Sequence, residues 1–198
     1  MENLNWLPID VPKFSYSREV IRDFKRNYVP PTAKQFWAQK LTEPTIDYSP
    51  VRWVGDLTES QKKLANFIDE NLPFEYVINV KIHHPRTMGN WHLDFTEPEK
   101  NKEIYAHNKI TDPCGYRIVL QGNRVGDLEV KTSVGSEVPI LPEETDVYVI
   151  GHTAVPHRTI SINPNRYIVF IHGKVDPDQH QYLLERSLEK YRDFAIWN

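Results

Sequence analysis

The residues best suited to chemistry in this sequence are histidines that have acidic or basic partners at short spacing. His92 and Asp94 stand two positions apart in the stretch WHLDF. Side chains two apart on a β-strand point to the same face, so this imidazole and this carboxylate are expected to converge. One nitrogen and one oxygen donor suit a borderline divalent metal ion. The pair alone does not make a metal site, and it also fits a surface hydrogen bond between histidine and aspartate.

A third ligand is available in the C-terminal half, where His157 opens the strand-like stretch HRTISI. Two histidines and one carboxylate form the facial triad of non-haem iron sites, which leaves coordination positions open. His152 competes for the same role, but we prefer His157 because of the spacing to the arginine that follows. Arg166 comes nine positions after His157, at the start of the stretch RYIVFIHG.

Arg166 is expected to share a face with His157 if these two stretches form a hairpin. A four-residue turn over residues 162–165 would bring Ser161 opposite Arg166. Thr159 and His157 would then lie on the face of the arginine, whereas a three-residue turn would put Arg166 on the other face. In the first arrangement the planar guanidinium would grip a carboxylate through two hydrogen bonds, about the length of a small dicarboxylate from the metal.

The elements that must position these residues are helices towards both ends of the chain and strands between them. Residues 1–15 are expected to form an extended or irregular arm. Thr58 and Gln61 fit a capping box before one of the helices. Apolar residues at helical spacing predict helices over residues 17–28, 32–41, 61–72 and 178–193. Stretches rich in Val, Ile, Tyr and Phe predict strands in FEYVINVKI, WHLDF, YRIVLQG, LEVKT, VPIL, DVYVIG, HRTISI and RYIVFIHG.

The predicted fold is therefore mainly β with flanking helices, an α+β fold whose strands form an antiparallel sandwich or barrel. A single domain is expected over residues 1–198. Within it, residues 1–73 would form the arm and supporting helices, residues 74–175 the strand-rich core, and residues 176–198 the closing helix. The polar interval 97–115 between two strands is long for a compact domain and is a candidate substrate lid.

Composition argues against several classes of partner. The chain has 198 residues, a net charge of −3 and one cysteine, Cys114. No apolar run is long enough to cross a bilayer and no secretory signal opens the chain, so no membrane partner is expected. The absence of a strong basic field argues against a nucleic-acid partner. A single cysteine excludes an intrachain disulfide and a zinc site of two thiolates, and it favours a reducing, cytoplasmic setting.

The order of these motifs resembles that of the iron(II)- and 2-oxoglutarate-dependent dioxygenases, which have His-x-Asp, a distal histidine and a basic residue some ten positions later. The stretch HTAVPHRTISINPNRYIVFIHG is particularly similar, and YVINVKIHHPRTMGNWHLDF looks like the strand that leads into the iron motif of that family. The resemblance covers roughly residues 74–175. It implies a double-stranded β-helix, a jelly-roll or cupin-like fold.

The resemblance also implies roles for individual residues. His92, Asp94 and His157 would bind Fe(II), and Arg166 would bind the distal carboxylate of the co-substrate 2-oxoglutarate. The implied reaction uses dioxygen to hydroxylate an unactivated C–H bond of an amino acid, a protein side chain or another small molecule, with release of succinate and CO₂. A carboxylate at Asp94, in place of Gly or Ala, favours hydroxylation over halogenation within the family pattern.

The sequence departs from the family pattern at the co-substrate site. Where many members have a tyrosine about nine positions before the first iron ligand, this chain has His83. His83 would remake that contact or Lys81 would supply a charge, unless this region is only a solvated strand end. Arg117 would pair with a co-substrate or substrate carboxylate, or with a neighbouring acid in a salt bridge.

Two other interpretations fit the same residues. One is a jelly-roll binding, structural or assembly protein that keeps the fold without catalysis. The other is a cupin-like metal protein that uses the His/Asp/His set for a different reaction and has no arginine clamp. Arg166 separates these interpretations, because only the 2-oxoglutarate enzyme requires it for binding of the co-substrate.

Overall fold

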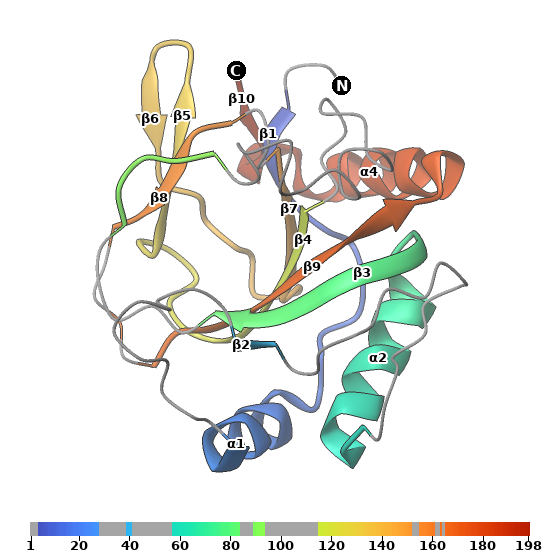
Figure 1. Cartoon of the computed structure of the whole chain (residues 1–198). Helices are drawn as coiled ribbons and strands as arrows, with labels where there is room; N and C mark the ends of the chain where they lie inside the picture. The colour runs from blue at the N-terminus through green and yellow to red at the C-terminus, as the bar shows by residue number, and fades with distance from the viewer. Residues whose placement is uncertain are drawn as a thin grey trace, which may run out of the picture.

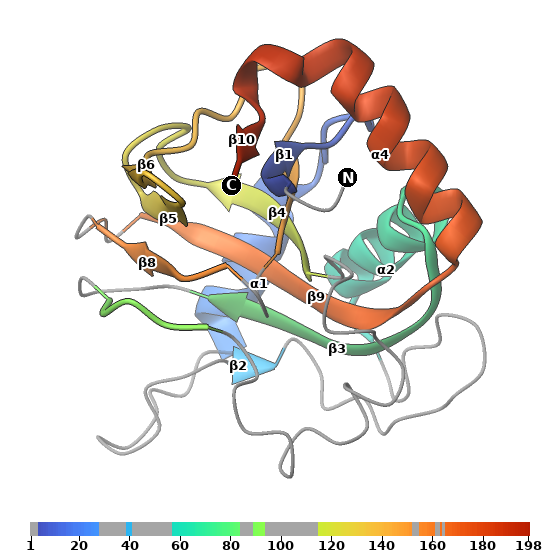
Figure 2. The ribbon, with the colours of Figure 1, turned by 90° about the horizontal axis from the view of Figure 1, so that it is seen from above.

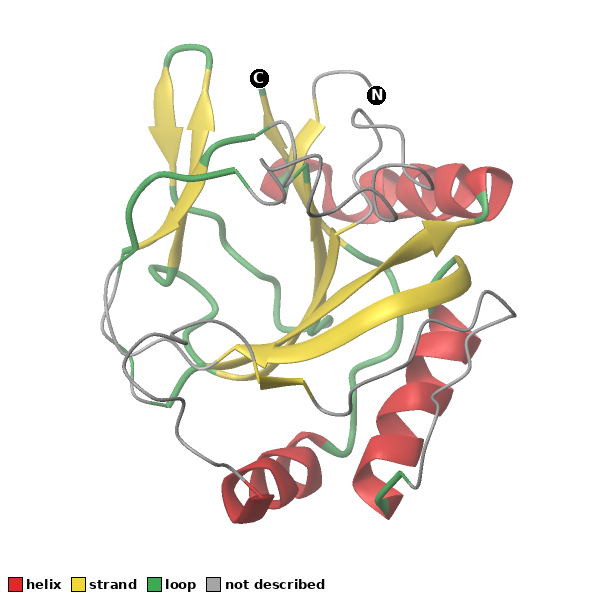
Figure 3. Ribbon diagram, viewed as in Figure 1, coloured by secondary structure: helices red, strands yellow, loops and turns green. Residues whose placement is uncertain are grey.

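A computed structural model describes residues 4–27, 39–40, 57–83, 89–93, 115–151, 155–160, 163 and 165–198. These parts of the chain form a mixed α+β structure with antiparallel sheets (Figures 1 and 3). No helix among the described residues is long and apolar enough to span a bilayer.

The strands of the described residues belong to two sheets, and all of their pairings are antiparallel. The larger sheet has the order β10-β1-β7-β4-β9-β3-β2, and the smaller sheet has the order β6-β5-β8. The strands of the larger sheet are β1 (Leu4–Pro8), β2 (Gln39–Lys40), β3 (Phe74–His83), β4 (Gly115–Gln121), β7 (Val147–Ile150), β9 (Tyr167–Val175) and β10 (Ile196–Trp197). Those of the smaller sheet are β5 (Leu128–Thr132), β6 (Gly135–Glu137) and β8 (His157–Thr159).

The helices pack on one face of the seven-stranded sheet. They are α1 (Ser17–Asn27), α2 (Glu59–Asn71) and α4 (Pro177–Tyr191), the last followed by the 3₁₀ helix η1 (Arg192–Phe194). Their apolar stripes, including Val20, Leu64 and Leu183, join alternate residues of the strands in one buried cluster. Burial of this cluster is the main stabilising contribution on this side, because the free energy scales with apolar area removed from water.

The opposite face of the seven-stranded sheet packs against the smaller sheet. Alternation along β4 shows the division: Tyr116 and Ile118 belong to the helix-side cluster, whereas Val119 belongs to a second cluster together with Val130 of β5. Figure 2 shows the same arrangement, with β5, β6 and β8 at the left and with α2 and α4 at the right. The second apolar cluster therefore lies between the two sheets.

Several predicted elements are confirmed. The capping box forms as expected at the start of α2, where Gln61 N donates to Thr58 Oγ1 and Thr58 N donates to Gln61 Oε1. The expected helices over residues 17–28 and 178–193 correspond to α1 and α4. Six of the eight strand-like stretches from residue 74 onward correspond to β3, β4, β5, β7, β8 and β9. The described part of WHLDF, residues 91–93, forms only an isolated bridge at His92.

One other local prediction is incomplete and two are wrong, because a local pattern does not show which distant strand a segment pairs with. Part of the expected arm is β1, which lies between β10 and β7 in the sheet. Gln39 and Lys40, expected in a helix, pair with β3 instead, and the rest of that predicted helix lies outside the described residues. The stretch VPIL contributes an isolated bridge from Ile140 to Val125 and no strand.

The loop before β7 depends on Arg124. Its guanidinium donates to the carbonyls of Leu141, Pro142 and Thr145 and to the Asp146 carboxylate. We expect Arg124→Ala to lower the free energy of unfolding by about 2 kcal/mol, because hydrogen bonds that involve a charged group carry more stability than neutral ones. Urea unfolding would measure the loss, with Arg192→Ala at the exposed Arg192 as control. Equal unfolding midpoints for both variants would contradict this role.

Candidate active site

His92 and His157 lie side by side although they are far apart in the chain. They form an isolated antiparallel bridge, in which His92 N donates to His157 O at 3.1 Å and His157 N donates to His92 O at 3.0 Å. Their ring centroids are 4.5 Å apart, with the rings tilted by 51°. Residues directly opposite in an antiparallel pair point to the same face, so both imidazoles share one side of this bridge. The structure thus brings together two of the three predicted metal ligands.

Each imidazole is oriented by a backbone carbonyl. The Nδ1 atom of His92 lies 2.8 Å from the carbonyl oxygen of Asn90, and Nδ1 of His157 lies 3.0 Å from that of Val155. A carbonyl oxygen only accepts hydrogen bonds, so Nδ1 carries the proton in both rings. In the neutral tautomer Nε2 is then the nitrogen with the lone pair, which is the arrangement of many metal-binding histidines.

The remaining predicted ligand, Asp94, lies outside the described residues, as does the competing His152. The described part of the chain, which contains His92 and His157 but not Asp94, has no cluster of three or more His, Cys, Asp or Glu residues able to hold a metal ion. His157 is buried and His92 is exposed, so the pair stands where the interior meets solvent. The participation of Asp94 stays a prediction from its spacing to His92.

Arg166 is buried just before β9, at the turn that precedes the strand. Its backbone N donates to Asn163 O at 3.2 Å, and Asn165 N donates to Asn163 Oδ1 at 2.9 Å. The guanidinium Nε lies 3.7 Å from Asp127 Oδ2, and the side chains of both residues are less than a tenth exposed. Burial lowers the pKa of the Arg166 guanidinium below its ordinary value, and Tyr148 and Asp127 oppose that shift.

The predicted hairpin between HRTISI and RYIVFIHG does not form. β8 pairs with β5 in the smaller sheet, whereas β9 pairs with β3 and β4 in the larger sheet. Arg166 therefore does not face Ser161 across a strand pair, and Ser161 lies outside the described residues. His157 and Thr159 are nevertheless buried on the inner face of β8. His157 thus belongs to the smaller sheet, whereas Arg166 immediately precedes a strand of the larger sheet. The predicted placement of both residues on one strand pair is therefore wrong.

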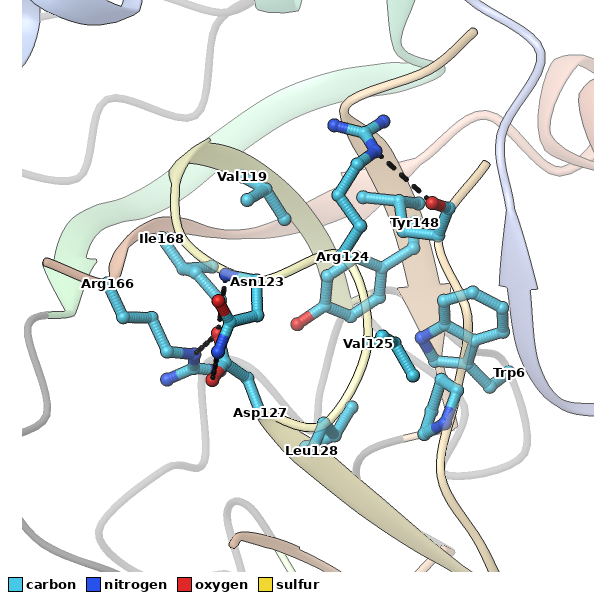
Figure 4. Close-up of a pocket in the computed structure, with 12 residues that line it drawn as sticks. Trp6, Val119, Asn123, Arg124, Val125, Asp127, Leu128, Tyr148, Arg166 and Ile168 are labelled. Atoms are coloured by element: carbon cyan, nitrogen blue, oxygen red, sulfur yellow. Dashed lines mark hydrogen bonds and ion pairs between the residues drawn. The ribbon is translucent and has the colours of Figure 1, made fainter. Parts of the chain in front are cut away.

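A small pocket adjoins the Arg166 side chain (Figure 4). Its lining includes Asn123 and Asp127 from the turn after β4, and Tyr148 and Trp6 from neighbouring strands. Asp127 is fixed by Asn123, whose backbone N and side-chain Nδ2 donate to its carboxylate at 3.0 and 3.2 Å. Asp127, Asn123 and Tyr148 were not predicted from the sequence. Gly126 lies in the turn next to Asp127 and has a positive φ of 86°. The glycine is a turn signal in the sequence, but no sequence pattern indicated that this turn would contact Arg166.

The other predicted co-substrate residues lie on β3 and β4. Arg117 is 1% exposed, its guanidinium lies 3.9 Å over the ring of Phe170, and its Nη1 donates to Tyr116 O at 3.2 Å. Lys81 is in register with Phe170 from the other side. His83 is in register with Ile168 at the end of β3. The backbone thus puts Lys81, Phe170 and Arg117 in one row across the sheet, and the roles of Lys81 and His83 stay predictions.

The comparisons with known proteins do not assign the chain to a family. It matches no known protein-family model, and its sequence matches no curated protein. The features of the structure that bear on function are therefore the paired histidines, the buried arginine and the arrangement of the strands.

Proposed function

We propose that this protein is an iron(II)- and 2-oxoglutarate-dependent oxygenase that hydroxylates an unactivated C–H bond. The observation that carries the proposal is the pairing of His92 with His157, each with its Nδ1 held by a backbone carbonyl. Such second contacts fix the ring and its tautomer in metal sites. Two histidine residues from separate segments thus lie side by side, with Nε2 of each neutral ring as the nitrogen that can bind a metal ion.

His92 and His157 would hold the metal ion through their Nε2 atoms, and Asp94 would complete the set as the carboxylate. A histidine–histidine–carboxylate set suits Fe(II) and leaves positions open for further ligands. Bound there, Fe(II) would supply the activation of dioxygen, coupled to the conversion of 2-oxoglutarate to succinate and CO₂. The protein itself would orient the substrate and exclude water.

Arg166 would bind the far carboxylate of 2-oxoglutarate. Its guanidinium is buried between the sheets, where burial disfavours the charged form and lowers its pKa. An incoming carboxylate would offset that cost through two parallel charge-assisted hydrogen bonds. Asp127 approaches at Nε and would keep the side chain in place, while the terminal nitrogens would meet the ligand. Arg117 adds a second buried positive charge between the sheets for a co-substrate or substrate carboxylate.

The order of the strands supports a jelly-roll or double-stranded β-helix core. Eight segments follow one another in the chain: β3, residues 89–93, β4, β5, β6, β7, β8 and β9. If these segments are numbered 1 to 8 in chain order, the neighbouring strands β7, β4, β9 and β3 of the larger sheet are segments 6-3-8-1. In the smaller sheet, β6, β5 and β8 followed by residues 89–93 are segments 5-4-7-2. Two interleaved sheets with these orders are the arrangement of a jelly roll. In it the first histidine would lie on strand 2 and the second on strand 7, which are neighbours.

The substrate class that fits the proposal is an amino acid, a protein side chain or another small molecule that is met by loops of the core. A cytoplasmic setting, which keeps both iron and the single cysteine reduced, suits the same chemistry.

Anaerobic addition of Fe(II) and 2-oxoglutarate tests the proposal. The protein should develop the weak visible charge-transfer band of a chelate between the iron and the keto acid, and admission of air should then yield succinate. Metal binding with no such band would instead indicate a cupin-like metal protein with another reaction. Failure to bind either component would leave a protein without this catalysis, and would overturn the proposal.

A further inference from the structure

Trp91 lies next to His92 but on the other side of the same short segment. The two segments joined by the bridge between His92 and His157 run in opposite directions. Trp91, which precedes His92, therefore lies opposite Arg158, which follows His157. Alternation then turns Trp91 and Arg158 towards the outer face of the three-stranded sheet, while the two histidines take the inner face. Arg158 also forms an ion pair with Glu129 of β5.

Two cations hold the Trp91 indole. Lys131 Nζ lies 4.5 Å from the centroid of the ring, and Arg158 Cζ lies 4.6 Å from it. Both cations come from the sheet itself, Lys131 from β5 and Arg158 from β8. Each is within the range of a cation–π interaction, which favours a cation over the face of tryptophan.

Glu129 fixes the arginine of this group. Its Oε2 accepts hydrogen bonds from Nε of Arg158 at 2.6 Å and lies 2.6 Å from Nη2. Ser136 of β6 also donates to the Glu129 carboxylate. These contacts lower the pKa of Glu129, with the Ser136 hydrogen bond as the first cause and Arg158 after it. The support for Trp91 therefore extends across all three strands of the smaller sheet.

The segment that carries His92 is attached to β8 through its backbone. Residues 89–93 are joined to β8 by Gly89 N donating to Thr159 O and by the two hydrogen bonds between His92 and His157. The His92 side chain itself is exposed, whereas Trp91 and Leu93 are partly buried. The two cation–π contacts of Trp91 are side-chain contacts that join this segment to the smaller sheet on its outer face.

We infer that Trp91 is a positioning residue for the metal site, acting through the clamp formed by Lys131 and Arg158 to hold His92 against His157. This inference rests on the proposed function, because His92 has to be positioned only if it binds a metal ion. Without the indole, the 89–93 segment loses its attachment to the outer face, and the His92 imidazole has to be ordered when the metal binds. The cost appears as weaker metal affinity, while the global fold remains.

Titration with Co(II), followed by its visible absorption, tests the inference without any turnover. Trp91→Ala should weaken Co(II) binding about tenfold, in the range that loss of an outer contact costs a metal site. Trp91→Phe keeps an aromatic face for the cations and should restore most of the affinity. Trp197→Ala, which removes an exposed indole from the edge strand β10, is the matched control and should bind as the wild type does. Thermal unfolding of each variant checks that the fold persists.

The cation partners give a second, independent comparison. Arg158→Ala should also weaken Co(II) binding, and in the Trp91→Ala background it should have little further effect, because the two residues act as one unit. The positioning role would be overturned if Trp91→Ala bound Co(II) as tightly as the wild type. It would also be overturned if the losses of Co(II) affinity in the two single variants added up in the double variant. If the wild type itself failed to bind Co(II), the metal site of the proposed function would be overturned, and the positioning role with it.

Discussion

Replacement of His157 by alanine is expected to abolish metal binding and the turnover of 2-oxoglutarate. His157 is the buried member of the histidine pair, and its ring is already oriented by Val155 O. Loss of a direct ligand should weaken Fe(II) or Co(II) binding by more than the 10- to 100-fold that loss of an outer contact costs. Calorimetric titration of the metal would measure the affinity, and succinate release would measure turnover.

His180→Asn is the matched control for this loss of an imidazole. Nδ1 of His180 is 2.7 Å from the hydroxyl of Tyr116, on the helix side of the larger sheet. Asparagine can keep a hydrogen bond to that hydroxyl. The control variant should therefore bind the metal as tightly as the wild type. Unchanged metal affinity in His157→Ala, with the fold intact, would exclude His157 as a ligand and leave His152 as the candidate.

Replacement of Arg166 is expected to raise the requirement for 2-oxoglutarate strongly while leaving metal affinity in place. Truncation of one partner in a buried pair of charges costs about 2–5 kcal/mol, which is about 30-fold or more in affinity. Lysine keeps the charge but loses the planar fork, so Arg166→Lys should still bind 2-oxoglutarate at least about tenfold more weakly. Equilibrium binding of 2-oxoglutarate under anaerobic conditions would measure both.

The alanine variant at this position needs a control for stability. Arg166→Ala leaves the buried Asp127 carboxylate without its nearby cation, a change that costs about 3–5 kcal/mol in buried pairs. Addition of Asp127→Asn removes that charge and should recover part of the stability. It should not recover the binding of 2-oxoglutarate. A double variant with normal co-substrate affinity would show that Arg166 acts on stability alone and would remove the arginine clamp from the mechanism.

Local signals predicted the elements whose own sequence decides their structure. The capping box at Thr58 and Gln61 determines where α2 begins, and the β-rich stretch LEVKT is β5 without a shift at either end. Pairing partners are a different matter, because they depend on contacts between distant segments. The sequence of β1, LNWLP, does not indicate that this strand lies between β10 and β7. The three-residue sequence of β6, GSE, has no pattern that predicts a strand.

The candidate site was predictable in its residue types but not in its construction. His92 and His157 meet as expected from the motif, although by a backbone bridge that the spacing did not indicate. Arg166 is buried, as expected of a residue that binds an anion between the sheets. The hairpin that was predicted to place it beside His157 does not form, because β8 and β9 belong to different sheets. The contact with Asp127 depends on the turn after β4, and a single sequence carries no signal for such a pairing.

The location of a bound metal ion tests the central claim most directly. Crystals grown with Mn(II) should show one strong anomalous peak within bonding distance of Nε2 of both His92 and His157, with the Asp94 carboxylate as the third protein ligand. A peak that contacts neither imidazole, or two histidine rings that stay in van der Waals contact at saturating metal with no peak between them, would contradict the account.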